Sequence, residues 1–400
     1  MTGSSTTGLS FADIIAPVTP EAFFDEYYDK KPLLIPGTPD KFPEMLTWGE
    51  LSSLLDITSI WTSDSLDLVL DCNLLKAQEY CFPTVDSGGA PIHRPDPDRV
   101  TELLNRGASL VCNDIARLQP GLAAIETALE AAFYSRVQAN LYCSWQAHQA
   151  FNSHFDTHDV FAIHIDGEKR WQIYEGRSDY PIADKRFKTI PQEEHDAAKG
   201  AVAQDLMMRP GDVLYLPRGL YHDALAVTGS SLHITYGVTR VIGYNIVQIL
   251  KDWGIADPLF RRNVPRPQEG RQALADHLAG LADQLEKTMK SKAFVDQIDG
   301  FHRSLYQPDE AYALPVDLDS PIYRVRGQGF SVSKEGPQWV LAGPRGKVPV
   351  PEGLEQPLGW IVARGSFTTD ALGRDNPGLT PAARDKLLQE LTSMRVIERV

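Results

Sequence analysis

The chain has 400 residues, of which 42% are hydrophobic and 23% charged, a composition typical of a globular protein of two or three domains. Its formal net charge of -14 argues against a general nucleic-acid binder, which needs a basic surface. An acidic surface favours solubility and also fits a basic protein partner. No run of about 18 apolar residues occurs, so the sequence predicts no membrane span.

The cysteines and the N-terminus indicate the cellular compartment. The 4 cysteines show no C-x-x-C spacing and no dense framework, which favours reduced thiols. The stretch MTGSSTTGLS has neither the basic nor the apolar region of a signal peptide. We therefore expect a cytoplasmic protein.

The first part of the chain predicts a helical extension with a few strands. In TPEAFFDEYYDKKPLLIPG, Thr19 and Pro20 form a favourable helix start, and aromatic residues follow at helical spacing. KKPLLIPG then predicts a short strand closed by a Pro-Gly turn. The apolar runs LDLVLDC and ASLVCND predict further strands, and residues 119–134 predict a helix.

Between residues 137 and 240 the pattern changes to strands. VQANLYCSW, DVFAIHI, RWQIY, DVLYLP, HDALAVT and SLHITYGVT are rich in β-branched and aromatic residues and are separated by turn signals. IDGEK and VTGSS predict hairpin turns. Many short antiparallel strands predict a mainly β core of the double-sheet jelly-roll type.

Helical periodicity returns between about residues 243 and 300. Its clearest part is RQALADHLAGLADQLEKTMK, whose apolar stripe consists of Leu274, Leu278, Leu281 and Leu285. This stripe either packs on the core of its own chain or forms a helix–helix contact in a dimer.

The tail mixes short strands such as QWVLAG with a helix that starts at Thr380 and Pro381. It predicts a small α+β domain of winged-helix type, without a basic recognition helix. The predicted domains are residues 1–240, the β core with its helical extension; residues 241–314, the helical region; and residues 315–400, the C-terminal domain.

The stretch NSHFDTHDVFAIHIDGEKRW, residues 152–171, crowds histidines and aspartates into a run that otherwise predicts strands. Side chains two apart in a strand share a face, so His154 and Asp156 can occupy adjacent positions on one metal ion. Two histidines and a carboxylate, with positions left open, are typical of non-haem Fe(II) oxygenases. His222 is the favoured third ligand, because the Pro-Arg-Gly irregularity before it can redirect its side chain. His233 in SLHITYG is its rival.

The remaining histidines of this part have other interpretations. His158 lies just beyond the motif and is either a rim residue or a substrate contact. His164 is a pocket or core histidine. His148 lies in a loop and is expected to be structural or exposed.

SHFDTHDVFAIHIDGEKRW, followed by GDVLYLPRGLYHDA and SLHITYGVT, resembles the JmjC-type, cupin-fold Fe(II)/2-oxoglutarate oxygenases, and most closely the ribosomal-oxygenase branch. The N-terminal FFDEYYDKKPLLIPG, the SLVCNDI segment, the helical region and the C-terminal domain match that branch in order. The resemblance implies a double-stranded β-helix core, a homodimer formed through the helical region, and a winged-helix-like C-terminal domain.

The same resemblance implies the ligand set and the cofactors. His154, Asp156 and His222 would hold Fe(II), with 2-oxoglutarate as cosubstrate and O2 as oxidant. Lys169, in GEKRW, would bind the distal carboxylate of 2-oxoglutarate by a charge-assisted hydrogen bond. Alternatively, Lys169 belongs to a charged hairpin tip.

Three further polar residues are candidates for binding the cosubstrate. Asn140 and Tyr142 share one face of the predicted strand QANLYCSW, which matches the family's strand near 2-oxoglutarate. Tyr142 is alternatively a core aromatic residue with a satisfied hydroxyl. Thr235 is a weaker candidate of the same kind.

The resemblance implies a dioxygenase that hydroxylates an amino-acid side chain of a protein or peptide, with a basic ribosomal protein as the expected substrate. One alternative is a peptide-tailoring hydroxylase of a biosynthetic pathway, because SWQAHQAFNSHFD differs from the family's commoner approach to the motif. A lysine demethylase is a variant of the same class. Two other classes remain. One is a cupin metalloenzyme that does not use 2-oxoglutarate, and Lys169 argues against it. The other is a catalytically silent binding module, and the complete ligand set argues against that.

Overall fold

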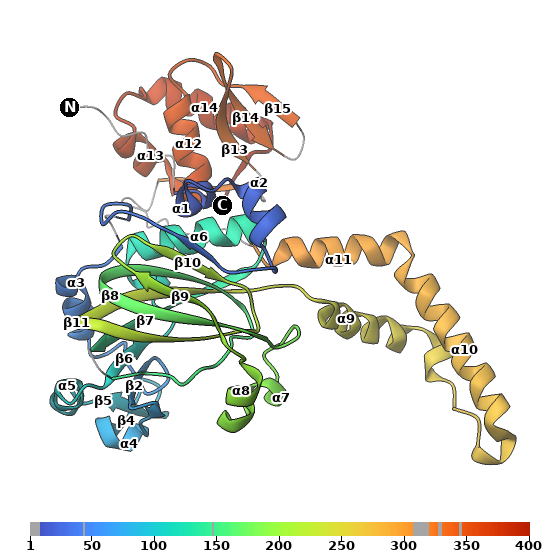
Figure 1. Cartoon of the computed structure of the whole chain (residues 1–400). Coiled ribbons are helices and arrows are strands. Elements are labelled where there is room, and N and C mark those ends of the chain that lie inside the picture. Colours follow the sequence, from blue (N-terminus) through green and yellow to red (C-terminus); the bar gives the residue numbers. More distant parts are fainter. Residues whose placement is uncertain (1–8, 43–44, 146–147, 307–319, 327–329, 344–345) are drawn as a thin grey trace. The chain divides into compact units, whose positions relative to one another are not determined.

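The computed structural model describes residues 9–42, 45–145, 148–306, 320–326, 330–343 and 346–400 (Figure 1). The chain divides into two compact units, Met1–Tyr306 and Gln307–Val400. The finer division of the first unit at residue 240 stays a prediction.

The first unit is built on a nine-stranded antiparallel sheet, drawn mostly in green in Figure 1. Its strand order is β1-β10-β8-β11-β7-β6-β2-β3, and β9 pairs with the remaining part of β8. A separate hairpin consists of β4 (Cys81–Val85) and β5 (Pro91–Pro95). The strands of the large sheet are β1 (Leu33–Ile35), β2 (Leu66–Leu70), β3 (Asn73–Leu74), β6 (Ser109–Cys112), β7 (Arg136–Trp145), β8 (Asp159–Arg177), β9 (Val202–Met208), β10 (Val213–Leu216) and β11 (Leu220–Thr239). The predicted mainly β core is confirmed.

The hairpin turns predicted at IDGEK and VTGSS are wrong, because β8 and β11 each run through these segments without a turn. The two strands pair along almost their whole length, with a register shift between Ala226 and Ser231. Gly167 lies at this shift with φ of +74°, and a Cβ there would come 2.1 Å from the Ser230 carbonyl oxygen. The glycine therefore marks an irregularity at which two long paired strands bend, and not a chain reversal.

Helices precede and follow the strands of this unit. The predicted helix at residues 119–134 is α6 (Pro120–Phe133), and the predicted start at Thr19 caps α2 (Pro20–Ala22), which continues into the π-helical turn η1 (Phe23–Tyr27). The other helices are α1 (Phe11–Ile15), α3 (Trp48–Leu55), α4 (Ala77–Tyr80), α5 (Pro97–Asn105), α7 (Lys185–Lys188), α8 (Gln192–Ala198), α9 (Gly243–Ala256), α10 (Gly270–Met289) and α11 (Lys292–Ser304), with short 3-10 turns at Ala116–Leu118, Pro258–Arg261 and Pro267–Glu269.

An aromatic cluster joins the N-terminal helices to the sheet. The ring centroid of Phe23 lies 5.3 Å from that of Phe11, 5.8 Å from that of Phe161 on β8 and 4.8 Å from that of Tyr215 on β10. Phe133 of α6 lies 5.7 Å from Phe161. The packing of these buried rings holds the helical extension against strands β8 and β10.

The second unit combines strands and helices, as the sequence predicts for an α+β domain. Its two three-stranded sheets have the orders β16-β12-β17 and β13-β14-β15. Leu387, Leu388 and Leu391 of α14 are buried in its core. The elements are β12 (Ile322–Val325), β13 (Ser331–Glu335), β14 (Gln338–Gly343), β15 (Gly346–Pro349), α12 (Glu355–Arg364), β16 (Ser366–Thr368), α13 (Thr369–Asp375), α14 (Pro381–Ser393) and β17 (Ile397–Arg399). Its winged-helix character stays a prediction.

Among the described residues, no helix combines the length and the apolar character that crossing a bilayer requires.

The contribution of the aromatic cluster to the stability of the fold can be tested by substitution. Phe23→Ala removes a fully buried ring and leaves a cavity between helices and sheet, so we expect the free energy of unfolding to fall by about 3–5 kcal/mol. Phe82→Ala is the matched control, because the Phe82 side chain is 40% exposed on β4. Urea unfolding followed by circular dichroism measures both, and equal effects of the two substitutions would contradict the assigned core.

Candidate metal centre

The segment that carries His154 and Asp156 is a loop and not a strand. Residues 152–158 precede β8, and a single isolated bridge ties them to β11. In that bridge His154 N donates to the His222 carbonyl at 3.1 Å, and His222 N donates to the His154 carbonyl at 2.9 Å. The prediction that strand alternation aligns His154 with Asp156 is therefore wrong. The bridge to β11 and the conformation of the loop bring the ligands together instead.

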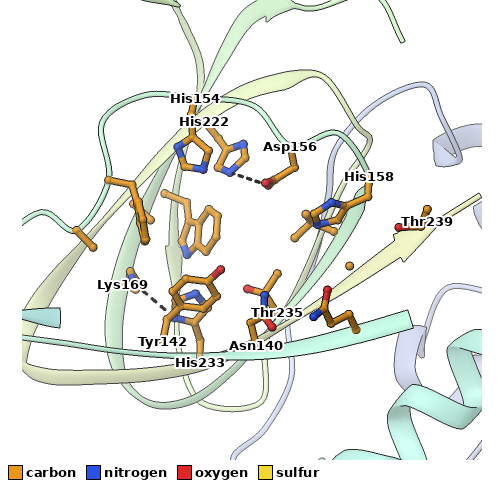
Figure 2. Close-up of a pocket in the computed structure, with 17 residues that line it drawn as sticks. Asn140, Tyr142, His154, Asp156, His158, Lys169, His222, His233, Thr235 and Thr239 are labelled. Atoms are coloured by element: carbon orange, nitrogen blue, oxygen red, sulfur yellow. Dashed lines mark hydrogen bonds and ion pairs between the residues drawn. The ribbon is translucent and has the colours of Figure 1, made fainter. Parts of the chain in front are cut away.

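The structure nevertheless brings His154, Asp156 and His222 together. One possible ligand atom from each lies within 4.8 Å of the others (Figure 2). His222 Nε2 lies 3.5 Å from Asp156 Oδ2, and the two imidazole centroids are 4.6 Å apart. His233, the rival ligand, lies at the other end of the pocket beside Lys169.

Backbone carbonyls select the tautomer of both histidines. His154 Nδ1 lies 2.8 Å from the Asn152 carbonyl oxygen, and His222 Nδ1 lies 3.0 Å from that of Leu220. A carbonyl only accepts, so each Nδ1 carries the proton and each Nε2 keeps its lone pair for a ligand. This is the second-sphere arrangement that metal-binding histidines commonly show.

Electrostatics keep His222 and Asp156 in the protonation states that a metal needs. Burial, together with the nearby His154, lowers the pKa of His222 to about 4, so its imidazole is neutral at pH 7. Burial alone would raise the pKa of Asp156, but the imidazoles of His158, His222 and His154 lower it below the ordinary value. A donor set of two imidazoles and one carboxylate fits a divalent transition metal such as Fe(II).

The three side chains face a cavity of ≈ 310 Å³, which all four predicted cosubstrate residues also line. These residues are Asn140, Tyr142, Lys169 and Thr235. His164 and His148 are not among the lining residues. His164 is buried in the sheet, and His148 pairs with Asp71 at 2.9 Å.

Lys169 is the buried cation of this cavity, with only 4% of its surface exposed. Its Nζ lies 3.4 Å from Ser144 Oγ and 3.5 Å from His233 Nδ1, and within the described residues it has no ion-pair partner. Burial lowers the pKa of Lys169 to about 8. A buried ammonium without a carboxylate is unfavourable, so the position suits an anionic ligand.

The alternative that Lys169 belongs to an exposed hairpin tip is excluded by its burial within β8. Its neighbour Arg170 points to the other face of the strand, where its Nε donates to Asp205 Oδ1 at 2.7 Å. Because successive side chains of a strand point to opposite faces, Lys169 lines the pocket and Arg170 does not.

The sequence reasoning does not name Trp171 or Gln138 as lining residues, and it considers His233 only as a rival metal ligand. Trp171 stacks on His222 with centroids 5.8 Å apart, and its buried Nε1 has no hydrogen-bond partner among the described atoms. His233 stacks on Tyr142 at 5.0 Å, and burial lowers its pKa well below the ordinary value. Gln138 also lines the cavity, and the alternation that selects Asn140 and Tyr142 could have found it.

The cavity has two chemically different ends. Figure 2 shows the candidate ligands at the top of the cavity, Lys169 toward its other end, and His158 and Thr239 along the side away from Lys169. The His158 ring packs against Gly237, where a Cβ would lie 2.6 Å from the ring. A side chain larger than hydrogen at this position would displace His158 from the pocket wall.

Comparison with known protein families gives a match for the part of the chain that holds this site. Residues 115–246 match the model of the JmjC domain. The chain carries a JmjC domain. This span includes the loop 152–158 and most of the residues that line the cavity.

Similar proteins include a ribosomal oxygenase and a bifunctional demethylase and hydroxylase, each matched over part of this chain. Ribosomal oxygenase 2 of Bos taurus is 29% identical over 304 residues, which cover 71% of this chain and 62% of that protein. The bifunctional lysine-specific demethylase and histidyl-hydroxylase NO66 of Aedes aegypti is 27% identical over 235 residues, or 57% of this chain and 34% of that protein. The chain thus spans less than two thirds of these relatives.

A solved structure has a similar fold. The ribosomal oxygenase YcfD from Escherichia coli, in complex with cobalt and 2-oxoglutarate, superposes with a TM-score of 0.50 at 15% sequence identity. The superposition covers 96% of this chain and 98% of YcfD. It supports the cupin-type fold of the JmjC domain.

Removal of a candidate ligand tests the site. We expect Asp156→Ala and His222→Ala to raise the dissociation constant for Co²⁺ by more than about 100-fold, because losing a ligand costs more than losing a group that only supports one. His148→Gln is the matched control outside the cavity. Isothermal titration with Co²⁺ measures all three, and unchanged binding in the first two variants would exclude this metal centre.

Proposed function

We propose that the chain is an Fe(II)- and 2-oxoglutarate-dependent oxygenase that hydroxylates an amino-acid side chain, with a ribosomal protein as substrate. The observation that carries the proposal is one cavity with the His154, Asp156 and His222 donor set at one end and the buried Lys169 at the other. The JmjC match and the relatives named ribosomal oxygenases support it.

His154, Asp156 and His222 would hold the metal through two Nε2 atoms and a carboxylate oxygen. Three protein ligands leave coordination positions open for a cosubstrate and O2. When bound, Fe(II) together with 2-oxoglutarate and O2 supplies the oxidation, in which the cosubstrate becomes succinate and CO2 and one oxygen atom enters the substrate. The protein itself then needs to provide orientation and shielding from water, and no separate acid or base is assigned.

Lys169 would bind the distal carboxylate of 2-oxoglutarate. The ammonium donates a charge-assisted hydrogen bond in a site from which water is excluded. Tyr142 lines the same region, and burial raises its pKa to about 12, so its hydroxyl stays a donor at neutral pH. Asn140 and Thr235 are the further polar residues that we assign to this end.

The substrate side chain would enter at the end formed by Gln138, His158 and Thr239. A ribosomal protein as partner agrees with the net charge of -14, because an acidic enzyme attracts a basic chain. The cytoplasm, expected from the sequence, is where such a substrate is made.

We further propose that the chain forms a homodimer through its helical region. We also propose that the C-terminal domain has a winged-helix-like fold. Leu274 and Leu278 of α10 are 39% and 54% exposed, so the core of their own unit leaves this stripe largely uncovered. A second copy of the helix would bury both side chains. Size-exclusion chromatography with light scattering of Leu278→Glu tests the contact.

Turnover without substrate tests the enzyme class. Wild-type protein loaded with Fe(II) is expected to form succinate from 2-oxoglutarate only when O2 is admitted. Asp156→Ala should lose this activity by at least about 100-fold, since a metal ligand is gone. Succinate is measured by mass spectrometry, with His148→Gln as the control. Turnover that persists in Asp156→Ala would contradict the proposal.

The pKa of Lys169 predicts a pH dependence of cosubstrate binding. Below pH 8 the ammonium is charged and the affinity for 2-oxoglutarate is highest. Above pH 8 binding must take up a proton, so the dissociation constant should rise about tenfold per pH unit. Lys169→Met should bind more weakly at every pH and lose the dependence. Calorimetry with Co²⁺-loaded protein measures it, and equal profiles of both proteins would contradict the assignment.

The substrate itself is found by comparing the ribosomal proteins of host cells with and without the gene. We expect one peptide that gains the mass of a single oxygen atom only when the gene is present. Purified wild-type protein should restore this gain, and Asp156→Ala should not.

A further inference from the structure

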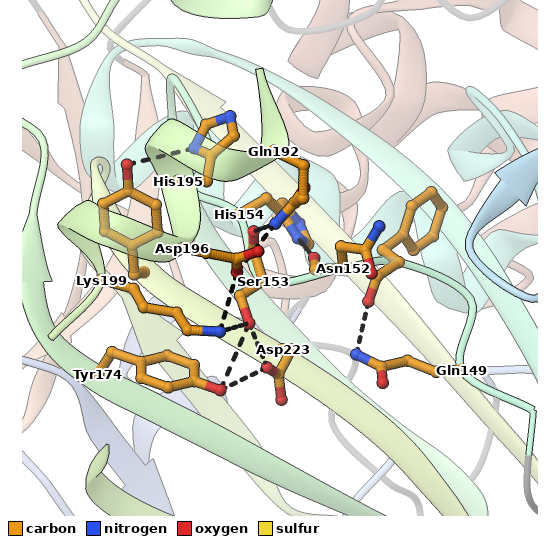
Figure 3. A network of polar contacts seen from close by, with 12 residues as sticks. Gln149, Asn152, Ser153, His154, Tyr174, Gln192, His195, Asp196, Lys199 and Asp223 are labelled. Carbon is orange, nitrogen blue, oxygen red and sulfur yellow. Dashed lines mark hydrogen bonds and ion pairs between the residues drawn. The ribbon is translucent and has the colours of Figure 1, made fainter. Parts of the chain in front are cut away.

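A polar network lies on the outer face of the sheet, directly behind the candidate metal centre (Figure 3). Its central residues, Ser153 and Asp223, are the chain neighbours of His154 and His222. Ser153 Oγ donates to Asp223 Oδ2 at 2.6 Å. This hydrogen bond therefore joins the two segments that carry His154 and His222, at the positions next to these two candidate ligands.

Two further groups converge on this pair. The Tyr174 hydroxyl donates to the same Asp223 Oδ2 at 2.7 Å. Lys199 Nζ donates to Ser153 Oγ at 3.0 Å and to Asp196 Oδ1 at 3.0 Å. The carboxylate of Asp223 thus receives two hydroxyl donors, and an ammonium donates to one of those hydroxyls, which makes both contacts charge-assisted.

The segment between β8 and β9, residues 178–201, reaches the loop from the same side. Gln192 Nε2, in α8, donates to the Ser153 carbonyl at 3.0 Å. His195 and Tyr221 pack against Phe155, with ring centroids 5.3 Å and 5.2 Å away. The loop residues before and after His154 are therefore held from outside the pocket.

These contacts from outside the pocket are needed because the loop 152–158 forms few backbone hydrogen bonds. Within the described residues, two backbone contacts hold 152–158: the His154 bridge to β11, and Gly219 N just before β11, which donates to the Asp156 carbonyl at 2.9 Å. A loop with few bonds samples several positions, whereas a metal site requires its donors within narrow limits. The network supplies the missing restraint.

We propose that Asp223 is a positioning residue, which acts through Ser153 to hold the His154–Asp156 loop against β11 in the geometry that binds metal. Tyr174 and Lys199 hold Asp223 and Ser153 in place. The inference rests on the proposed metal site, but concerns residues that line no part of the cavity.

Metal binding by the apo chain tests the inference without any catalytic assay. Asp223→Asn keeps the shape of the side chain and removes its charge. We expect it to raise the dissociation constant for Co²⁺ about tenfold, the loss commonly seen when an outer partner of a metal site is changed. The visible absorption of bound Co²⁺ should shift as well, because it reports the ligand geometry.

Asp205→Asn is the matched control. Asp205 pairs with Gln172 across the β8–β9 ladder, and Gln172 pairs with Asp223 across β8 and β11, so both carboxylates lie in one row of the sheet. Asp205 forms an exposed ion pair with Arg170, and among the described residues no hydrogen bond or ion pair joins it to the loop. Its variant should bind Co²⁺ as the wild type does.

A double-mutant cycle separates positioning from loss of folding. Ser153→Ala and Asp223→Asn should each weaken Co²⁺ binding, and the double variant should be little worse than either, because one removes and the other weakens the same hydrogen bond. Tyr174→Phe, which removes one hydroxyl and keeps the buried ring, is the milder variant should Asp223→Asn fail to fold; it is expected to weaken Co²⁺ binding several-fold.

The outcomes are distinct. If wild-type protein binds Co²⁺ and both Asp223→Asn and Tyr174→Phe bind it equally well with the same spectrum, the positioning role is wrong while the metal site stands. Independent, additive effects of Ser153→Ala and Asp223→Asn would also overturn it. If the wild type binds no Co²⁺, the proposed function fails, and the inference with it.

Discussion

The bridge between His154 and His222 is the contact on which the candidate site depends. Two reciprocal backbone hydrogen bonds place a loop residue and a strand residue side by side, so their imidazoles point into the same space. Asp156 follows within the same loop, and its carbonyl accepts from Gly219 just before β11. Backbone pairing to β11 and to the residue before it therefore brings the three ligands together, and the hydrogen bond between Ser153 and Asp223 adds to this restraint.

The length of β8 and β11 explains why this bridge can form. Both strands continue through the glycine-containing segments at which a chain reversal would have separated them. One end of β11 carries His222 opposite Ile173, and its other half pairs with β7, which carries Asn140 and Tyr142. A bent, continuous pair of strands therefore brings the metal end and the lysine end of the cavity into one scaffold.

The sequence predicts much of this organisation, because strand composition, helix starts and apolar periodicity are local properties. β7, α6 and α14 lie where the patterns place them. The wrong turn at IDGEK has a physical origin: Gly167 is compatible with a turn or with a bulge, and only the partner strand decides. The network of Ser153, Tyr174 and Asp223 is likewise invisible in the sequence, because it joins residues up to 70 positions apart that match no periodic pattern.

The charge distribution of the cavity limits what can bind in it. Burial keeps the imidazole of His233 neutral and the hydroxyl of Tyr142 protonated, so these walls carry no charge at pH 7. Lys169 contributes a positive charge at one end, and the metal proposed at the other end would contribute a second. A ligand with a single carboxylate would leave one of these cations unneutralised in a buried site, which is unfavourable. A short dicarboxylate satisfies both, and its reach across the cavity explains why the lysine and the metal ligands face one another from opposite ends.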